Sequence, residues 1–154
     1  MKFLKRGTAI LISSILAFNI VACGGSGSGS GSASGINYSV KLTAEQEIEK
    51  YGEDAVNEVN ALYDTWSDEE KEKQWHQSAI QIPEIMEAIE KMEAEIDDHE
   101  EHKENLKKFK SLMERVSEAF KGAYAPEKLR NVMLDTAALM KEVGTDFMAF
   151  YSGY

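Results

Sequence analysis

Apolar residues recur every three or four positions along several stretches of this chain, the spacing of one face of an α-helix. In the first stretch they are Ile48, Tyr51, Ala55, Val59, Leu62 and Trp66. Thr43 precedes it, with Gln46 three residues later, and this pair fits a capping box. Gly52 is its weak point, because glycine is a poor helix former. We expect one helix here, ending where Ser67 and Glu70 form a second capping box.

A longer apolar stripe covers Asp68–Lys121, which holds no glycine and one proline, Pro83. Its members are Trp75, Ala79, Ile82, Ile85, Met86, Ile89, Met92, Ile96, Leu106, Phe109, Met113, Val116 and Phe120. A single helix of this length would span about 80 Å, which so small a domain cannot cover. A break within residues 97–102, where Asp97 and Glu100 would cap a new helix, gives a hairpin with a kink at Pro83. We favour this hairpin; the alternative is one straight helix over residues 83–121.

A last stripe follows Gly122, which we expect to end the preceding helix, and Pro126, which suits a first helical turn. It consists of Leu129, Met133, Thr136, Met140, Val143, Phe147, Phe150 and Tyr154. Before the first helix, Tyr38, Val40 and Leu42 alternate with polar residues, so we expect an extended segment against the core. No stretch shows repeated strands. The chain is therefore predicted to be all-α, as an antiparallel four-helix bundle.

The first 22 residues have a different character. A start with three basic residues and no acid leads into Ala9–Val21, an apolar run interrupted by three polar residues, and then Ala22 precedes Cys23. This order is typical of a secretory signal peptide. The apolar run would rise only about 20 Å as a helix, against a hydrocarbon core of about 30 Å. A permanent membrane span is therefore not expected.

The ending Ile20-Val21-Ala22-Cys23 resembles the lipobox of bacterial lipoproteins, although these more often have leucine where this chain has Ile20. The resemblance implies cleavage before Cys23 by signal peptidase II and a diacylglyceryl group on its sulfur. Two acyl chains hold a protein on a membrane firmly, whereas one does so only marginally. Cys23 is also the sole cysteine, which excludes an intramolecular disulfide. An ordinary signal peptide or short anchor is the alternative.

Residues 24–35 contain only glycine, serine and one alanine. Such chains are flexible coils, and twelve residues reach about 19 Å on average. The run is expected to be a tether, whether natural or an engineered fusion segment. The chain then divides into a signal peptide (1–22), the lipidated cysteine with its linker (23–36) and a helical domain (37–154).

Composition limits the partners of this domain. The full chain has 17 basic and 27 acidic residues, and three of the basic ones lie in the leader. The domain therefore carries 14 basic against 27 acidic residues, a formal charge of −13. Nucleic acid and anionic headgroups would repel it, so neither is an expected partner. Its 118 residues suffice for one domain with a modest core.

His99 and His102 are the candidate metal ligands. They lie three residues apart among acidic residues, so a helix would bring both imidazoles to one face. Carboxylate-bridged sites in bundles need a Glu-x-x-His on each of two helices, and the residues three places before the histidines of this chain are Lys73, Ile96 and His99. We interpret the pair as part of a polar hairpin tip and assign no metal ligands or cofactors; a metal site is the alternative.

The remaining candidates point to packing. Six methionines fall in the domain, most of them on the stripes, and we expect them to fill the core: Met86, Met92, Met113, Met133, Met140 and Met148. The C-terminal aromatics Phe147, Phe150, Tyr151 and Tyr154 are also expected in the core, or else to grip a partner helix. Trp66 and Trp75 are interpreted as anchors at a bundle end, although exposure there would suggest a ligand groove.

No phosphate-binding loop or activated nucleophile is present in the sequence, so we expect no enzyme. The order of leader, linker and small domain resembles that of small exported lipoproteins that block phage DNA entry or redundant conjugation. The resemblance is in this layout alone. The predicted function is a membrane-anchored lipoprotein, exposed outside the cytoplasmic membrane, whose domain binds an envelope or membrane protein. A small-ligand or metal-binding lipoprotein is the alternative.

Overall fold

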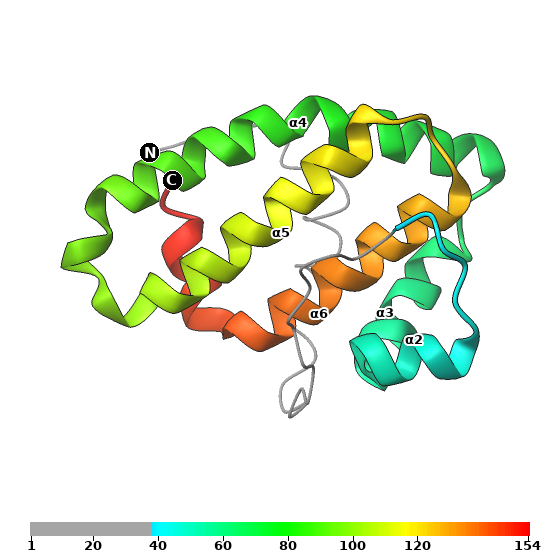
Figure 1. Ribbon diagram of the computed structural model, residues 1–154, viewed down its shortest axis with the longest axis horizontal. Coiled ribbons are helices and arrows are strands. Elements are labelled where there is room, and N and C mark those ends of the chain that lie inside the picture. The colour runs from blue at the N-terminus through cyan, green and yellow to red at the C-terminus, as the bar shows by residue number, and fades with distance from the viewer. Residues whose placement is uncertain (1–37) are drawn as a thin grey trace.

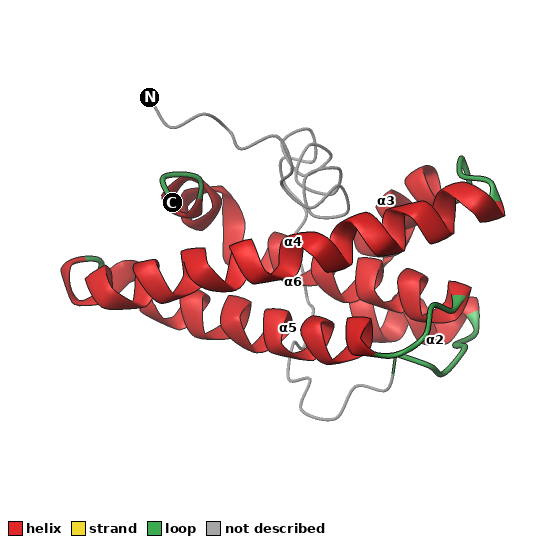
Figure 2. Cartoon of the chain, turned by 90° about the horizontal axis from the view of Figure 1, so that it is seen from above, coloured by secondary structure: helices red, strands yellow, loops and turns green. Residues whose placement is uncertain are grey.

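The computed structural model describes residues 38–154, so the leader, Cys23 and the Gly/Ser run lie outside the described residues. Within this range all regular structure is helical, which confirms the all-α prediction (Figure 2). The helices are α2 (Ala44–Tyr51), α3 (Glu53–Tyr63), α4 (Asp68–Glu95), α5 (Lys103–Lys121) and α6 (Pro126–Tyr151), with short 3-10 turns η1 (Ile96–Asp98) and η2 (Glu100–His102).

The predicted first helix is divided into α2 and α3, so the expectation of one continuous helix is wrong. Thr43 forms the predicted capping box: its Oγ1 accepts from the Gln46 amide at 3.2 Å, and the Gln46 side chain accepts from the Thr43 amide at 2.9 Å. The chain breaks at Gly52, where φ is 91° and ψ is 148°. Side chains strongly disfavour this conformation, and glycine tolerates it. The break lets α2 and α3 turn separate buried faces towards the core.

The hairpin between α4 and α5 is confirmed, and the straight helix over residues 83–121 is wrong. Helix α4 continues through Pro83 for 28 residues. Two 3-10 turns then reverse the chain across residues 96–102 (Figure 1). The predicted caps at Asp97 and Glu100 are wrong, because α5 begins after His102 and has no side-chain cap.

Helix α4 begins as the sequence predicts at Ser67, whose Oγ accepts from the Glu70 amide at 3.2 Å. The reciprocal half of a capping box is replaced, since the Glu70 carboxylate accepts from Gln74 at 2.7 Å. Gly122 ends α5 and Pro126 opens α6, both as expected.

Helix α6 lies at the centre of the domain. It packs against α2, α3, α4 and α5, and Figure 1 shows it running beneath α5 and beside the two short helices. All seven residues from 131 to 137 are buried, a pattern expected only of a helix covered on every side. The other helices therefore form a shell around α6.

A second break, not predicted from the sequence, interrupts α6 at Gly144, where φ is 78° and ψ is 176°. The chain then turns back towards α4, as the red segment of Figure 1 shows. The side-chain amide of Asn105 on α5 donates to the carbonyl of Val143 at 3.3 Å, next to the break. Phe147, beyond the break, is fully buried.

We expect Gly52→Ala to destabilise the domain by about 1–3 kcal/mol, the usual cost of holding a side chain in such a backbone conformation. No atom lies within 4 Å of the added methyl group, so the cost is purely conformational. Urea unfolding would measure it.

Gly122→Ala is the matched control, because Gly122 has a φ of −85°. Its added methyl group meets the flexible end of Lys128, at 2.6 Å, so little change is expected. Equal stability of the two variants would contradict the requirement for glycine at Gly52.

Candidate functional site at the seam between the N-terminal strap and α6

Residues 38–42, here called the strap, precede α2 and lie against α6. The side-chain amide of Asn131 donates to the carbonyl oxygens of Tyr38 and Val40, each at 2.7 Å. The Tyr38 hydroxyl donates to the Asp135 carboxylate. Asn131 and Asp135 are four residues apart, which places them on one face of α6. The central helix therefore holds the strap by both its backbone and its side chain.

The expectation of an extended segment against the core is confirmed only in part, because residues 38–40 form a turn and a bend. Tyr38 is buried, and Leu42 is half-buried and packs on the core. Val40 is 47% exposed, so its predicted inward position is wrong. The reason is that Asn131 holds the backbone of Val40 while its side chain turns outward.

The Asp135 carboxylate also joins α5 to α6. Arg115 donates to the Asp135 Oδ2 from Nε at 3.3 Å and from Nη2 at 3.1 Å, and its Nη1 donates to Ser111 at 2.9 Å. The Tyr38 hydroxyl bonds to the same Oδ2. One buried oxygen therefore accepts from the strap and from α5 together, so the strap, α5 and α6 meet at one carboxylate.

Burial, reinforced by the negative charge of Asp135, raises the pKa of Tyr38 well above its ordinary value. Tyr51 on α2 shows the same direction: burial raises its pKa first, followed by the charges of Asp135 and Glu47. Both phenols therefore stay protonated at neutral pH and act as neutral groups. The arrangement suits the binding of a short turn of chain that carries a tyrosine.

Three further ion pairs tie the shell to α6. Glu47 on α2 is buried and accepts two hydrogen bonds from Arg130, at 2.9 and 3.0 Å. Lys141 pairs with Glu58 on α3 at 2.6 Å, and Glu142 pairs with Lys108 on α5 at 2.6 Å. These partners were not predicted from the sequence, because the residues of each pair lie 34 or more positions apart.

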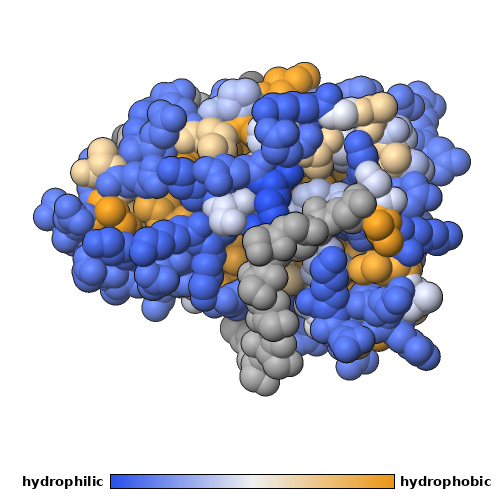
Figure 3. All heavy atoms as spheres, viewed as in Figure 1, coloured by the Kyte–Doolittle hydropathy of each residue, from blue (hydrophilic) through white to orange (hydrophobic). Residues whose placement is uncertain are grey.

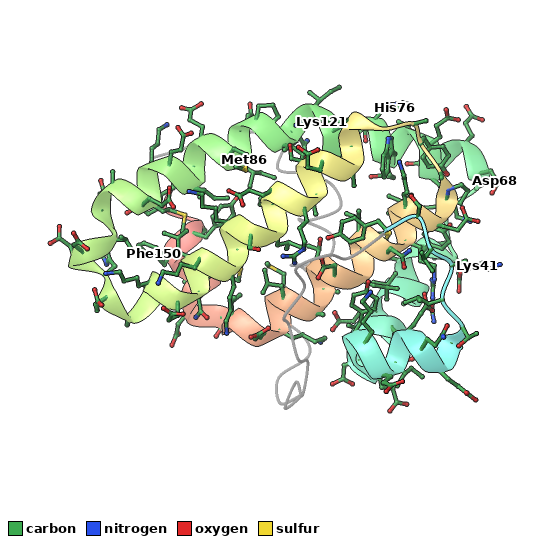
Figure 4. All side chains as sticks on the ribbon, viewed as in Figure 1. Lys41, Asp68, His76, Met86, Lys121 and Phe150 are labelled. Atoms are coloured by element: carbon green, nitrogen blue, oxygen red, sulfur yellow. The ribbon has the colours of Figure 1, made fainter. Side chains whose placement is uncertain are left out.

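His99 and His102 lie at the hairpin turn, as predicted, but they are packed against an aromatic ring. The ring centroids of His102 and Phe150 lie 4.5 Å apart with an interplanar angle of 15°, and those of His99 and Phe150 lie 4.8 Å apart. Figure 4 shows Phe150 at the hairpin end of the bundle. Among residues 38–154, no three histidine, cysteine, aspartate or glutamate side chains are grouped to hold a metal ion.

The C-terminal aromatics pack at the same end of the bundle. The Phe109 ring lies 5.8 Å from that of Phe147 and 5.0 Å from that of Tyr151. The Tyr154 hydroxyl donates to Glu95 near the end of α4. Phe147 is fully buried, whereas the last three aromatics are half-buried against the core, which supports the prediction that this set packs in the core.

The opposite end is closed by Trp75, which is almost fully buried, with its ring 4.3 Å from Phe120 and 5.8 Å from Tyr124. Trp66 is half-buried against the core. The methionines lie in the core as predicted: Met92, Met113, Met133 and Met140 are buried, and Met86 and Met148 are half-buried.

A row of polar side chains on α4 was not singled out from the sequence. It comprises Gln74, Gln77, Ser78 and Gln81, which share one face of the helix by their spacing. The amide oxygens of the three glutamines and the hydroxyl oxygen of Ser78 are buried and have no hydrogen-bond partner in the described part of the chain. A buried acceptor without a donor costs about 1–3 kcal/mol. In the sequence, the available signal for this row was that four polar residues occur along the apolar stripe of the helix.

Comparison of the chain with protein-family models, curated proteins and solved structures gave no match. Over residues 38–154, the helices are all too short or too polar to cross a membrane. The visible face in Figure 3 is largely hydrophilic, with scattered apolar groups.

Asp135→Ala is expected to destabilise the domain on the order of 3 kcal/mol, because it leaves the largely covered Arg115 without its partner. The control is Glu104→Ala, which breaks the exposed pair with Lys107 (3.1 Å) and should cause no measurable change. Chemical unfolding of both variants decides: similar stabilities would show that the Asp135 pair contributes no more than a surface pair.

Alkaline pH should destabilise the fold through Tyr38 and Tyr51. Tyrosines of the unfolded chain ionise near pH ~10, whereas these two retain their protons in the folded state. Above this pH the unfolded chain binds fewer protons than the folded chain. The free energy of unfolding therefore falls by about 1.4 kcal/mol per pH unit for each such tyrosine.

Tyr38→Phe removes one of these two groups and should give a shallower loss of stability from pH ~10 upward. Unfolding free energies measured across this range for the wild type and the variant would test this. Identical slopes would mean that Tyr38 ionises alike in both states.

Proposed function

We propose that the protein is a lipid-anchored, non-catalytic binding domain, held on the outer side of the membrane by a diacylglyceryl group on Cys23. Its acidic helical domain, residues 37–154, binds an envelope or membrane protein. The observation that carries this proposal is the strap seat: the chain that follows the Gly/Ser run is fixed to the central helix by Asn131 and Asp135. An anchor at Cys23 would reach the domain through the strap, which supports a partner that binds the outer faces of the shell helices.

The charge of the domain supports a protein partner over a lipid surface. A formal charge of −13 is repelled by anionic headgroups, so the domain gains nothing by lying on the membrane. Helix α4 supplies a suitable exposed face, since 28 residues extend about 42 Å. Ile80 on this helix is 76% exposed, the most exposed large apolar side chain of the described range.

The small-ligand alternative is less well supported. A carrier would need space among Trp66, Trp75 and the methionines, but Trp75 packs on Phe120 and Tyr124. The metal alternative depends on His99 and His102, whose rings lie against Phe150. Among residues 38–154 no third histidine, cysteine, aspartate or glutamate is grouped with this pair, so a binding surface is the better use of this arrangement.

Crosslinking on living cells, followed by mass spectrometry, is expected to capture one envelope or membrane protein reproducibly. Cys23→Ser should release the protein from the membrane fraction, or leave the precursor uncut, and abolish this capture. Failure of labelled fatty acid to incorporate at Cys23 would contradict the anchoring half of the proposal.

Ile80→Glu tests the binding half, and should reduce the crosslinked product about tenfold if Ile80 is a central contact. Ile48→Glu is the matched control, because Ile48 is 43% exposed on α2. If crosslinking captures no protein and a small molecule co-purifies at one per chain, the small-ligand alternative would be favoured.

A further inference from the structure

Helix α4 carries a polar stripe along one flank of its apolar stripe. Its members recur at alternating intervals of four and three residues and so share one side of the helix: Glu70, Gln74, Gln77, Gln81 and Glu84, with Ser78 beside them. The amide oxygens of the three glutamines and the Ser78 hydroxyl are buried without a hydrogen-bond partner in the described range. Gln74 is 6% exposed and Ser78 is 1% exposed. Buried polar groups are normally paired, so several unpaired oxygens on two helical turns indicate a binding site.

The unpaired groups of this stripe are oxygens, and no nitrogen of the same side chains is among them. The orientation of the first amide is fixed by its neighbour, because the Gln74 amide nitrogen donates to the Glu70 carboxylate at 2.7 Å. The reverse orientation would place the amide oxygen against a negative charge. Gln74 therefore presents an oxygen that needs a donor. A molecule bound along the stripe must supply hydrogen-bond donors.

The spacing of these oxygens favours an extended ligand. Between Gln74 and Gln81 the helix rises about 10 Å. A bound polypeptide would bring a carbonyl acceptor with almost every N–H donor, and the stripe offers few groups to satisfy those carbonyls. Protonated amines donate hydrogen bonds and accept none. A chain of amines joined by short methylene segments therefore fits this row better than a peptide does.

Negative charge stands at both ends of the stripe. Glu70 and Glu84 lie about 21 Å apart along the helix. Glu84 is exposed, and the side chain of Glu70 is 36% exposed, with the Lys73 Nζ at 4.0 Å. The domain as a whole has 14 basic and 27 acidic residues, a formal charge of −13. A cationic ligand is therefore attracted to the domain, and the two carboxylates favour one that is long.

The buried oxygens can be reached through two members of the stripe. Gln77 and Gln81 are half-buried, so part of each side chain meets water while its oxygen is covered. The last torsion of a glutamine side chain has a broad energy minimum, and rotation about it turns the oxygen outward. Figure 4 labels His76 and Met86, which bracket this part of α4.

We propose that this flank of α4 binds a linear polyamine. Its ammonium groups donate to the oxygens of Gln77, Ser78 and Gln81, and one end pairs with Glu84. The inference goes beyond the proposed function and does not depend on it, because binding requires neither the lipid on Cys23 nor a protein partner. The two can therefore fail separately.

Isothermal titration calorimetry of the wild-type protein, in a non-ionic detergent and at physiological salt, tests the proposal with spermidine as the probe. Hexaamminecobalt(III) is the control ligand, since it has the same triple charge in a compact form. Spermidine should bind at one per chain, at least about tenfold more tightly than the control, because only a linear ligand reaches successive oxygens of the row. Equal affinities, or no binding of spermidine, would overturn the proposal.

Gln77→Met/Gln81→Met removes two acceptor oxygens at unchanged charge and nearly unchanged length. Spermidine should bind this variant at least about tenfold more weakly. Its resistance to urea should not fall, because the variant buries no unpaired amide at these positions. Asn57→Met is the control, since Asn57 is an exposed amide on α3, and it should bind as the wild type does. If circular dichroism shows the double variant unfolded, Gln77→Met alone replaces it. Unchanged affinity in the folded variant would contradict the assigned site.

A second pair of variants separates the site from the overall charge. Glu84→Gln and Glu104→Gln each remove one exposed carboxylate, but Glu104 lies on α5. Glu84→Gln should weaken spermidine binding about threefold or more, whereas Glu104→Gln should change it little at physiological salt. Equal losses in the two variants would show that spermidine responds only to the net charge of the domain, and would overturn the proposal.

Discussion

A helix that is buried on every side needs a partner for each polar side chain it carries, and this requirement shapes the whole domain. Helix α6 holds Asn131, Asp135 and Thr136 within its buried segment. Thr136 bonds to the carbonyl of Val132 in its own helix at 2.8 Å, but the other two need groups from outside. The strap and Arg115 supply them. The polar residues of α6 thus fix where its neighbours lie.

Local signals in the sequence were sufficient for most of the helical framework. The caps at Thr43 and Ser67, the proline at Pro126 and the reversal within residues 97–102 all follow from spacing and from the properties of single residues. The two glycine breaks are different. Gly52 could be recognised as a poor helix former. The helix breaks there because α2 and α3 bury different faces against α6, and the sequence does not show this.

The candidate site could be predicted only in part, because it is made of distant pairs. Tyr38 could be assigned to a segment packed on the core, yet its partner Asp135 lies 97 residues away. Within the stripe of α6, Asn131 and Asp135 occur beside apolar residues in a fully buried segment, and that irregularity was the available signal. No spacing rule connects two such residues to a strap near the start of the domain.

The position of the strap seat has a mechanical consequence. The strap is bonded to residues well inside α6, and it precedes the first cap of the domain at Thr43. A pull that arrives from the N-terminal side is therefore borne first by Asn131 and Asp135, and reaches α2 only after their hydrogen bonds have broken. The contact between the strap and α6 therefore resists a pulling force before that force reaches the helices of the shell.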